Sequence, residues 1–219
     1  MTKEAKILIA IAIVVLIGGV LLAIYANPQP AEPGKAVDEK SLIRDSSHMT
    51  GKPTAKVNLV EFGDYQCPGC AAAAPRVKEV VEFYKDNPDF NFVFRNFPLT
   101  QIHPNAMISA EAAEAAAAQG KFWEMHEMIY TKQAEWSTNA DPLEIFAGYA
   151  SSLGLNVDQF KGQVSQQSAK DVIAADLKDG EAVGIDSTPT FFINGVKIEQ
   201  QTVPTVDELK AKIDEALKK

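Results

Sequence analysis

The chain has 219 residues, of which 46% are hydrophobic and 23% charged, and its formal net charge is −8 at pH 7. This composition is typical of a globular protein, and the length predicts one domain of ordinary size with additional segments. The acidic balance argues against a nucleic-acid-binding protein, because such a protein would need a basic face.

The first feature along the chain is an uncharged, strongly apolar segment at residues 7–26. Its length is what a helix needs to cross a bilayer core, and it exceeds the apolar region of a usual signal peptide. We therefore predict a retained transmembrane anchor in the cell membrane, with cleavage after Ala26 as the alternative. The basic balance of residues 1–6 predicts a cytoplasmic N-terminus and an extracytoplasmic remainder, on the periplasmic or extracellular side, where disulfides persist.

Residues 27–53 are predicted to be an extracytoplasmic linker. Residues 27–35 contain three prolines and a glycine, a composition typical of extended, semi-rigid tethers. Residues 36–53 are polar, so we expect the folded domain, residues 54–219, to begin near Ala55.

A β–α–β unit opens this domain. The alternating, β-rich residues 56–62 predict a strand, and Pro68 suits the first position of a helix that continues to Tyr84. Residues 90–97 predict a second strand. Strands joined through a helix in this way are expected to be parallel, with a right-handed crossover.

Residues 105–184 are predicted to be mostly helical, and strand signals return after them. Residues 189–193 and 196–198 flank Asn194-Gly195, the strongest two-residue hairpin turn. Residues 205–217 predict a final amphipathic helix that opens with a capping box. The fold class is therefore α/β, with a helical insertion at about residues 105–184.

Both cysteines of the chain lie in the motif Cys67-Pro68-Gly69-Cys70. Closing so short a loop removes little entropy from the unfolded chain, which argues against a structural staple. A zinc site would normally need four ligands, and His48, His103 and His126 are widely spaced. We therefore predict a reversible dithiol/disulfide pair and no metal or other cofactor; an inert disulfide and half of a zinc site are the alternatives.

The two cysteines are expected to have different roles. Cys67 lies at the start of a helix, where free N–H groups and the helix dipole stabilise a thiolate. We predict that Cys67 is the attacked, exposed sulfur and that Cys70, one turn further on, is the resolving thiol. Pro68 and Gly69 set the turn and tune how strongly the disulfide oxidises other thiols.

Four separated segments carry a resemblance to a known family: VEFGDYQCPGC, RNFPL, HPNAMISAEAAEAAAAQGKFWEMHEMIY and STPTFFINGV. Together they resemble the DsbA-like thioredoxin-fold proteins, most of all the membrane-anchored bacterial group that oxidises thiols outside the cytoplasm. The resemblance covers about residues 42–217. It implies a thioredoxin fold with a helical insertion, with Cys67 as nucleophile and Cys70 as the second cysteine.

The resemblance also assigns roles to three residues outside the motif. It implies a cis peptide bond before Pro189, which would lie against the disulfide and leave the backbone of Thr188 free to pair with an extended substrate. A buried acid of the family falls on Glu61. On an apolar strand such a carboxyl would have a raised pKa and could exchange a proton with Cys70. The alternatives are a trans proline that opens an edge strand and a solvated acid at a strand end.

These features predict a membrane-tethered thiol–disulfide oxidoreductase that acts as a dithiol oxidase on cysteine-containing secreted or membrane proteins. The resemblance implies re-oxidation by a membrane, quinone-linked partner of the DsbB or VKOR type. A disulfide reductase or isomerase uses the same chemistry and is one alternative. A non-catalytic tethered binding or chaperone module is another.

Overall fold

The structure is a computed structural model that describes residues 13, 15–18, 36–199 and 202–219. Of the transmembrane segment predicted at residues 7–26, only residues 13 and 15–18 belong to this set, so most of that prediction lies outside the described residues. None of the helices formed by the described residues is both long and apolar enough to span a bilayer.

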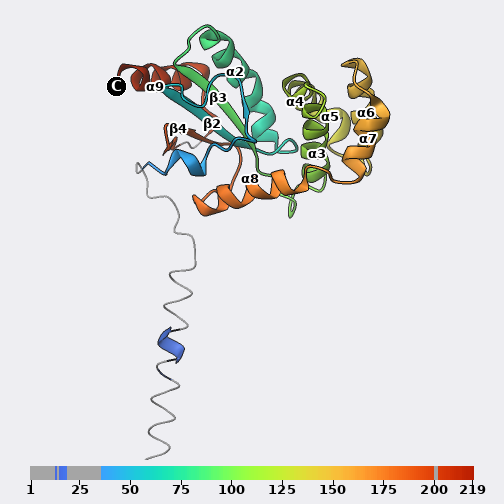
Figure 1. Cartoon of the computed structure of the whole chain (residues 1–219), viewed down its shortest axis with the longest axis horizontal. Helices are drawn as coiled ribbons and strands as arrows, with labels where there is room; N and C mark the ends of the chain where they lie inside the picture. Colours follow the sequence, from blue (N-terminus) through green and yellow to red (C-terminus); the bar gives the residue numbers. More distant parts are fainter. Residues whose placement is uncertain (1–12, 14, 19–35, 200–201) are drawn as a thin grey trace, which may run out of the picture.

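A five-stranded mixed sheet forms the centre of the domain, in the order β1-β3-β2-β4-β5 (Figure 1). The predicted β–α–β unit is present as β2 (Val57–Gly63), α2 (Pro68–Tyr84) and β3 (Phe90–Asn96), and β2 and β3 are parallel. The hairpin of β4 (Thr190–Ile193) and β5 (Val196–Lys197) adds antiparallel to β2.

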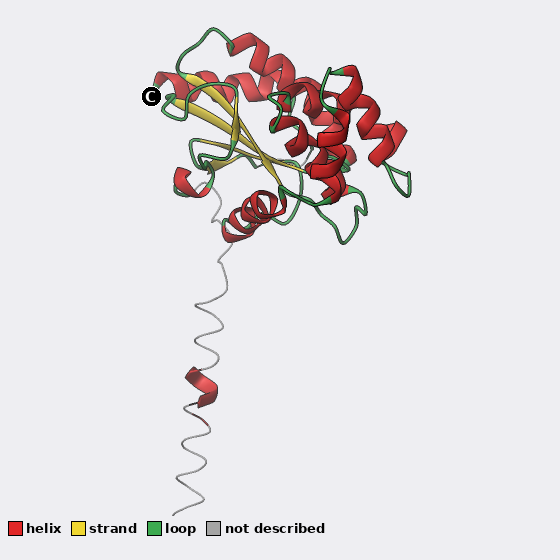
Figure 2. Cartoon of the chain, turned by 45° about the vertical axis from the view of Figure 1, so that its right-hand side comes forward, coloured by secondary structure: helices red, strands yellow, loops and turns green. Residues whose placement is uncertain are grey.

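Helices cover both faces of this sheet, which explains why every residue of β2 and β3 is buried (Figure 2). On one face Val57 and Leu59 belong to a core with α2 and α9 (Val206–Lys218). On the other face Val60 and Phe62 pack with apolar residues in and after α8 (Lys170–Ala182). As the alternating sequence of β2 predicts, its apolar side chains point in turn into two separate cores, one on each face of the sheet.

The helical insertion forms a lobe beside the sheet, seen on the right of Figure 1. It contains α3 (Ala106–Ala117), α4 (Phe122–Thr131), α5 (Gln133–Trp136), α6 (Leu143–Ser152) and α7 (Val157–Ser165). The buried alanines of α3 let its neighbours α4, α6 and α7 approach it closely. The last helix of the predicted helical block, α8, leaves the lobe and packs against β3.

The C-terminal helix and the hairpin form as their sequence signals predict. Thr205 caps α9, and its side chain and that of Glu208 complete the capping box. Asn194 and Gly195 have φ values of 47° and 80°, the positive angles that a two-residue hairpin turn requires. A Cβ atom on Gly195 would lie 2.3 Å from the carbonyl oxygen of Val37, so glycine is needed here for space as well.

The folded part begins earlier than Ala55, because residues 36–53 already pack on the domain. The turn η1 (Glu39–Ser41) leads to Leu42, which is fully buried. Strand β1 (His48–Met49) then pairs antiparallel with β3. The linker prediction for this stretch is therefore too long. This mostly polar stretch contains one fully buried apolar residue, Leu42, and an edge strand that is held through backbone hydrogen bonds.

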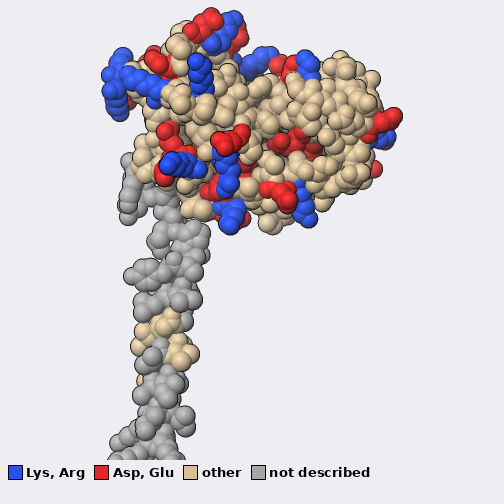
Figure 3. Space-filling view, in the orientation of Figure 1, with Lys and Arg blue, Asp and Glu red and all other residues tan. Residues whose placement is uncertain are grey.

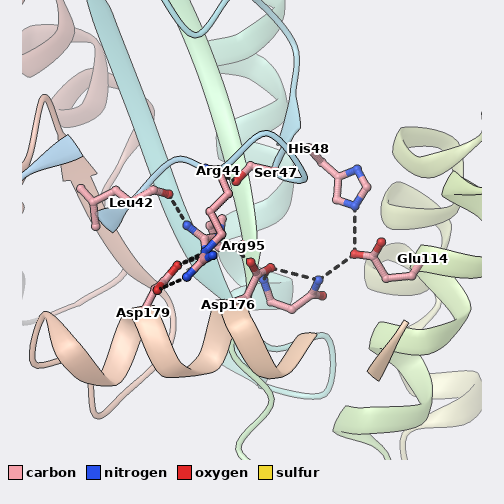
Figure 4. A network of polar contacts seen from close by, with 9 residues as sticks. Leu42, Arg44, Ser47, His48, Arg95, Glu114, Asp176 and Asp179 are labelled. Carbon is pink, nitrogen blue, oxygen red and sulfur yellow. Dashed lines mark hydrogen bonds and ion pairs between the residues drawn. The ribbon is translucent and has the colours of Figure 1, made fainter. Parts of the chain in front are cut away.

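A buried ion-pair network fastens α8 to the sheet (Figure 4). The Arg95 side chain of β3 is fully buried and bonds Asp176 at 2.6 Å and Asp179 at 2.7 Å, both on α8. It also donates to the Leu42 carbonyl at 2.5 Å, and Arg44 bonds the same Asp179 carboxylate. One guanidinium thus joins the sheet, α8 and the N-terminal segment.

Charged side chains on the surface are mixed in sign over the face that Figure 3 displays. The Lys78–Glu127 and Lys161–Glu144 pairs are examples of such exposed contacts. Exposed pairs of this kind contribute little stability, so the cores and the buried network hold the fold.

Candidate active site around Cys67 and Cys70

The CPGC motif lies at the N-terminus of α2. Cys67 is the N-cap residue, with extended backbone angles, and Pro68 occupies the first turn, as the sequence predicts. From α5, the Gln133 amide donates to the carbonyl oxygens of Tyr65 at 2.8 Å and of Cys67 at 3.1 Å. The helical lobe therefore holds the loop that carries the first cysteine.

Asp64 organises the other side of this loop, and the sequence analysis did not single it out. Its buried carboxylate accepts hydrogen bonds from the N–H groups of Gln66 and Leu99 and lies 2.7 Å from His103 Nδ1. Its own backbone N–H donates to Cys70 Sγ at 3.5 Å. The only signal in the sequence is an acid three residues before the first cysteine.

Both cysteines are free thiols in the structure, and their environments differ. The pKa of Cys67 is lowered to about 5, chiefly by a hydrogen bond with the Cys70 side chain. The Thr188 side chain and the N–H groups of Cys70 and Gly69 also lower this pKa, against the opposing effect of burial. Cys67 is therefore a thiolate at neutral pH, stabilised by the helix start as expected.

Cys70 is fully buried, and burial raises the pKa of its thiol well above the usual value. Its hydrogen bond to Cys67 and the negative charges of Glu61 and Cys67 raise this pKa further. A Cys70 thiolate therefore takes up a proton readily.

Glu61 lies in the centre of β2 and is 1% exposed, which agrees with the predicted burial. Burial raises its pKa to about 8, and the charge of Cys67 adds to the rise. In the sheet register it lies opposite Phe94 of β3 and Phe191 of β4. Its Oε1 atom has no hydrogen-bond partner among the described residues. A protonated carboxyl group thus lies close to the resolving thiol.

The Thr188-Pro189 peptide bond is cis, as predicted, and it faces the motif. The Cys67 thiol lies 3.3 Å from the Thr188 carbonyl oxygen. A Cβ atom on Gly69 would lie 3.3 Å from Pro189 Cδ and 3.5 Å from Cys67 Sγ. Glycine between the cysteines therefore keeps the sulfur and the proline close together.

An open cleft begins at these residues. Its volume is about 360 Å³, and its walls include Gly69, Thr188, Pro189, Lys197 and Glu199. The predicted site residues Cys67, Pro68, Gly69, Cys70, Thr188, Pro189 and Glu61 thus belong to one region, formed by β2, α2 and the segment before β4. The cleft therefore opens on the side of the motif that faces the proline.

The three histidines do not converge on the cysteines. His48 bonds Glu114 at 2.9 Å, His103 bonds Asp64, and His126 accepts or donates a 2.9 Å bond with the Tyr65 hydroxyl. Burial lowers the pKa of His126 to about 3, so it is neutral. Within the described part of the chain, no three potential metal-ligating side chains are grouped together.

A mixed sheet with helices on both faces, a CPGC motif at a helix start and a cis proline opposite it define a thioredoxin-like protein of the thiol–disulfide oxidoreductase class. Residues 44–215 match the sequence profile of the family described as Thioredoxin. The chain therefore belongs to the thioredoxin family.

Solved structures share this fold over most of the chain. Oxidised BdbD from Bacillus subtilis superposes with a TM-score of 0.72 at 24% identity, covering 87% of this chain and 100% of its own. A thioredoxin-like oxidoreductase from Silicibacter pomeroyi gives 0.69 at 25% identity, covering 84% and 99%. Wolbachia pipientis α-DsbA1 gives 0.71 at 21% identity, covering 82% and 94%. The fold is thus the DsbA-like form of the thioredoxin fold.

Curated relatives match the chain over a small part of their own length. A protein named Na⁺/H⁺ antiporter NhaA 1 from Salinispora arenicola is 39% identical over 151 residues, which are 69% of this chain and 22% of that protein. One of the same name from Mycobacterium sp. strain KMS is 35% identical over 198 residues, 88% of this chain and 31% of that protein. The chain therefore spans only about a fifth to a third of these relatives.

Proposed function

We propose that this protein is a dithiol oxidase that introduces disulfides into cysteine-containing secreted or membrane proteins. The observation that carries the proposal is the opposite shift of the two thiols: the pKa of Cys67 falls to about 5 and that of Cys70 rises. A stabilised thiolate favours the reduced form of the pair, which makes the disulfide form a stronger oxidant.

The two halves of the reaction use this asymmetry. A substrate thiolate attacks Cys67 Sγ of the oxidised pair, the Cys67–Cys70 bond breaks, and Cys70 leaves with the electron pair. The basic Cys70 thiolate takes a proton from the Glu61 carboxyl group, which is protonated at neutral pH. A second substrate thiolate then attacks the substrate sulfur of the mixed disulfide, and Cys67 leaves as a stable thiolate without needing a proton.

The alternatives predict other properties of the same site. A reductase of the cytosolic thioredoxin type would need a much lower reduction potential, and the stabilised Cys67 thiolate favours a higher one. A non-catalytic binding or chaperone module does not need two thiols with opposite pKa shifts.

We further propose that residues 7–26 anchor the domain in the cell membrane, with the catalytic part outside the cytoplasm. The apolar sequence of this segment supports the proposal. The relatives named as antiporters are in keeping with a domain that works beside a membrane. A membrane re-oxidase of the DsbB or VKOR type would then meet the pair at high effective concentration.

The decisive experiment traps the mixed disulfide. The full-length Cys70→Ser protein cannot resolve its adducts, so we expect disulfide-linked complexes that disappear on reduction. The matched control is the Cys67→Ser, Cys70→Ser double variant, which should trap nothing. Absence of adducts during active secretion, or a reduction potential as low as about −270 mV, would overturn the oxidase proposal.

A further inference from the structure

Two buried polar atoms without hydrogen-bond partners among the described residues lie close to Cys70. One is Glu61 Oε1 and the other is the hydroxyl oxygen of Tyr130, from α4 in the helical lobe. Tyr130 is 4% exposed. A buried hydroxyl without a partner loses the free energy of its hydration, so its position needs an explanation.

Gly63, at the end of β2, creates the space for this hydroxyl. A Cβ atom on Gly63 would lie 2.8 Å from the Tyr130 oxygen, so the hydroxyl lies where any other residue would place its side chain. Gly63 and Glu61 are two positions apart on one strand, so this space lies on the face that also bears Glu61. The next residue, Asp64, donates its N–H to Cys70 Sγ at 3.5 Å. The hydroxyl, the carboxyl and the thiol therefore surround the same short stretch of backbone.

The surroundings of Tyr130 keep it a hydrogen-bond donor. Its ring packs 4.7 Å from that of Tyr65 and 6.4 Å from that of Phe94. Burial raises its pKa well above the usual value, and the charges of Cys70, Glu61, Tyr65 and Asp64 act in the same direction. The hydroxyl is thus always protonated and can donate to an anion that forms beside it.

We infer that Tyr130 is a positioning residue that stabilises the Glu61 carboxylate formed when Glu61 gives its proton to Cys70. Its hydroxyl donates a hydrogen bond to this carboxylate, directly or through one buried water molecule. In this step the O–H bond of Glu61 breaks, an S–H bond forms on Cys70, and the negative charge moves from sulfur to the carboxylate. The inference rests on the proposed function, because only an oxidant releases Cys70 as a thiolate when substrate attacks.

The test measures the titration of Glu61 in the reduced full-length protein by the infrared absorption of its protonated carboxyl group. The absorption band that is missing from the Glu61→Gln variant identifies the Glu61 signal. Tyr130→Phe keeps the ring and removes only the donor. A donor to the charged form lowers a carboxyl pKa, so its loss should raise the pKa of Glu61 by about one to two pH units.

Tyr65→Phe is the matched control, because it removes a buried hydroxyl from the same aromatic cluster that is already bonded to His126 at 2.9 Å. It should leave the Glu61 titration unchanged. An unchanged Glu61 titration in Tyr130→Phe, or an equal shift in both variants, would overturn the inference. A wild-type protein that oxidises no thiols would contradict the proposed function instead, and the titration would still report on Tyr130.

Discussion

The sulfur of Cys67 lies 3.3 Å from the carbonyl oxygen of Thr188, although 121 positions separate the two residues in sequence. The side-chain hydroxyl of Thr188 is buried and has no hydrogen-bond partner among the described residues, and it contributes to the low pKa of Cys67. Thr188 thus contacts the reactive sulfur through its backbone carbonyl, and its side chain lowers the pKa of this sulfur. The two effects can be separated by mutation.

We expect Thr188→Val to raise the pKa of Cys67, because valine keeps the shape of the side chain and removes the hydroxyl that favours the thiolate. An upward shift of about one pH unit corresponds to a typical hydrogen bond to a charged group. The measurement is the ultraviolet absorbance of the thiolate against pH. Thr190→Val removes a hydroxyl bonded to the Ser187 carbonyl and should leave the titration unchanged. Equal curves for Thr188→Val and wild type would refute this role.

The alkylation rate of the reduced protein should depend on pH with a midpoint of about 5, the pKa of Cys67. Only the thiolate reacts with iodoacetamide, so the rate should rise through this pH and level off before neutrality. Mass spectrometry should find the modification on Cys67 and none on Cys70, whose buried thiol stays protonated. A midpoint near the usual thiol pKa would show that neither Cys70 nor the helix start activates Cys67.

Glu61→Gln should stabilise the folded protein at neutral pH and not at acidic pH. The folded-state pKa of Glu61 is raised from 4.5 to about 8, so folding penalises its ionisation. This penalty is absent below the unfolded pKa, grows between these two values and is constant above the higher one. A gain of roughly 2 to 4 kcal/mol in the free energy of unfolding is expected at neutral pH. Urea unfolding at several pH values tests this, and a gain independent of pH would contradict it.

Glu61→Gln should also slow the first half of the reaction, because glutamine has no proton to give to Cys70. The mixed disulfide with a model peptide should form more slowly in stopped-flow experiments, by about 10²- to 10⁴-fold for the loss of a general acid. The Cys67 alkylation rate serves as the control and should remain high. An unchanged rate of mixed-disulfide formation would remove Glu61 from the proton transfer.

Arg95→Met should destabilise the domain strongly. The buried guanidinium bonds Asp176 and Asp179, and its loss leaves the 4%-exposed side chain of Asp176 as a buried charge without its cationic partner. Breaking one side of such a pair costs about 3 to 5 kcal/mol. Lys78→Ala breaks the exposed pair with Glu127 and should cost no more than about 1 kcal/mol. Similar midpoints of thermal unfolding for both variants would show that the buried network contributes little.

Local sequence signals predicted much of the fold. The positions of β2, α2 and β3, the Asn194-Gly195 turn and the Thr205 capping box follow from periodicity and from residues whose backbone preferences act over a few positions. The edge strand β1 and the buried Leu42 were missed, because their partners lie about 45 to 55 positions away and no local pattern marks them.

The sequence by itself determined that the chain has a redox-type cysteine pair at a helix start, because that chemistry depends on residues within one turn of Cys67. The acid at Glu61 and the proline at Pro189 were assigned by family resemblance, and their burial and geometry required the folded chain. Only the tertiary structure placed Thr188 against Cys67, Asp64 against Cys70 and Tyr130 over Gly63. These contacts join separate strands and helices, and packing of the helical lobe on the sheet brings Tyr130 to the site. The unequal acidity of the two thiols needs the folded chain as well, because burial raises the pKa of Cys70 and the hydrogen bond between the two cysteines lowers that of Cys67.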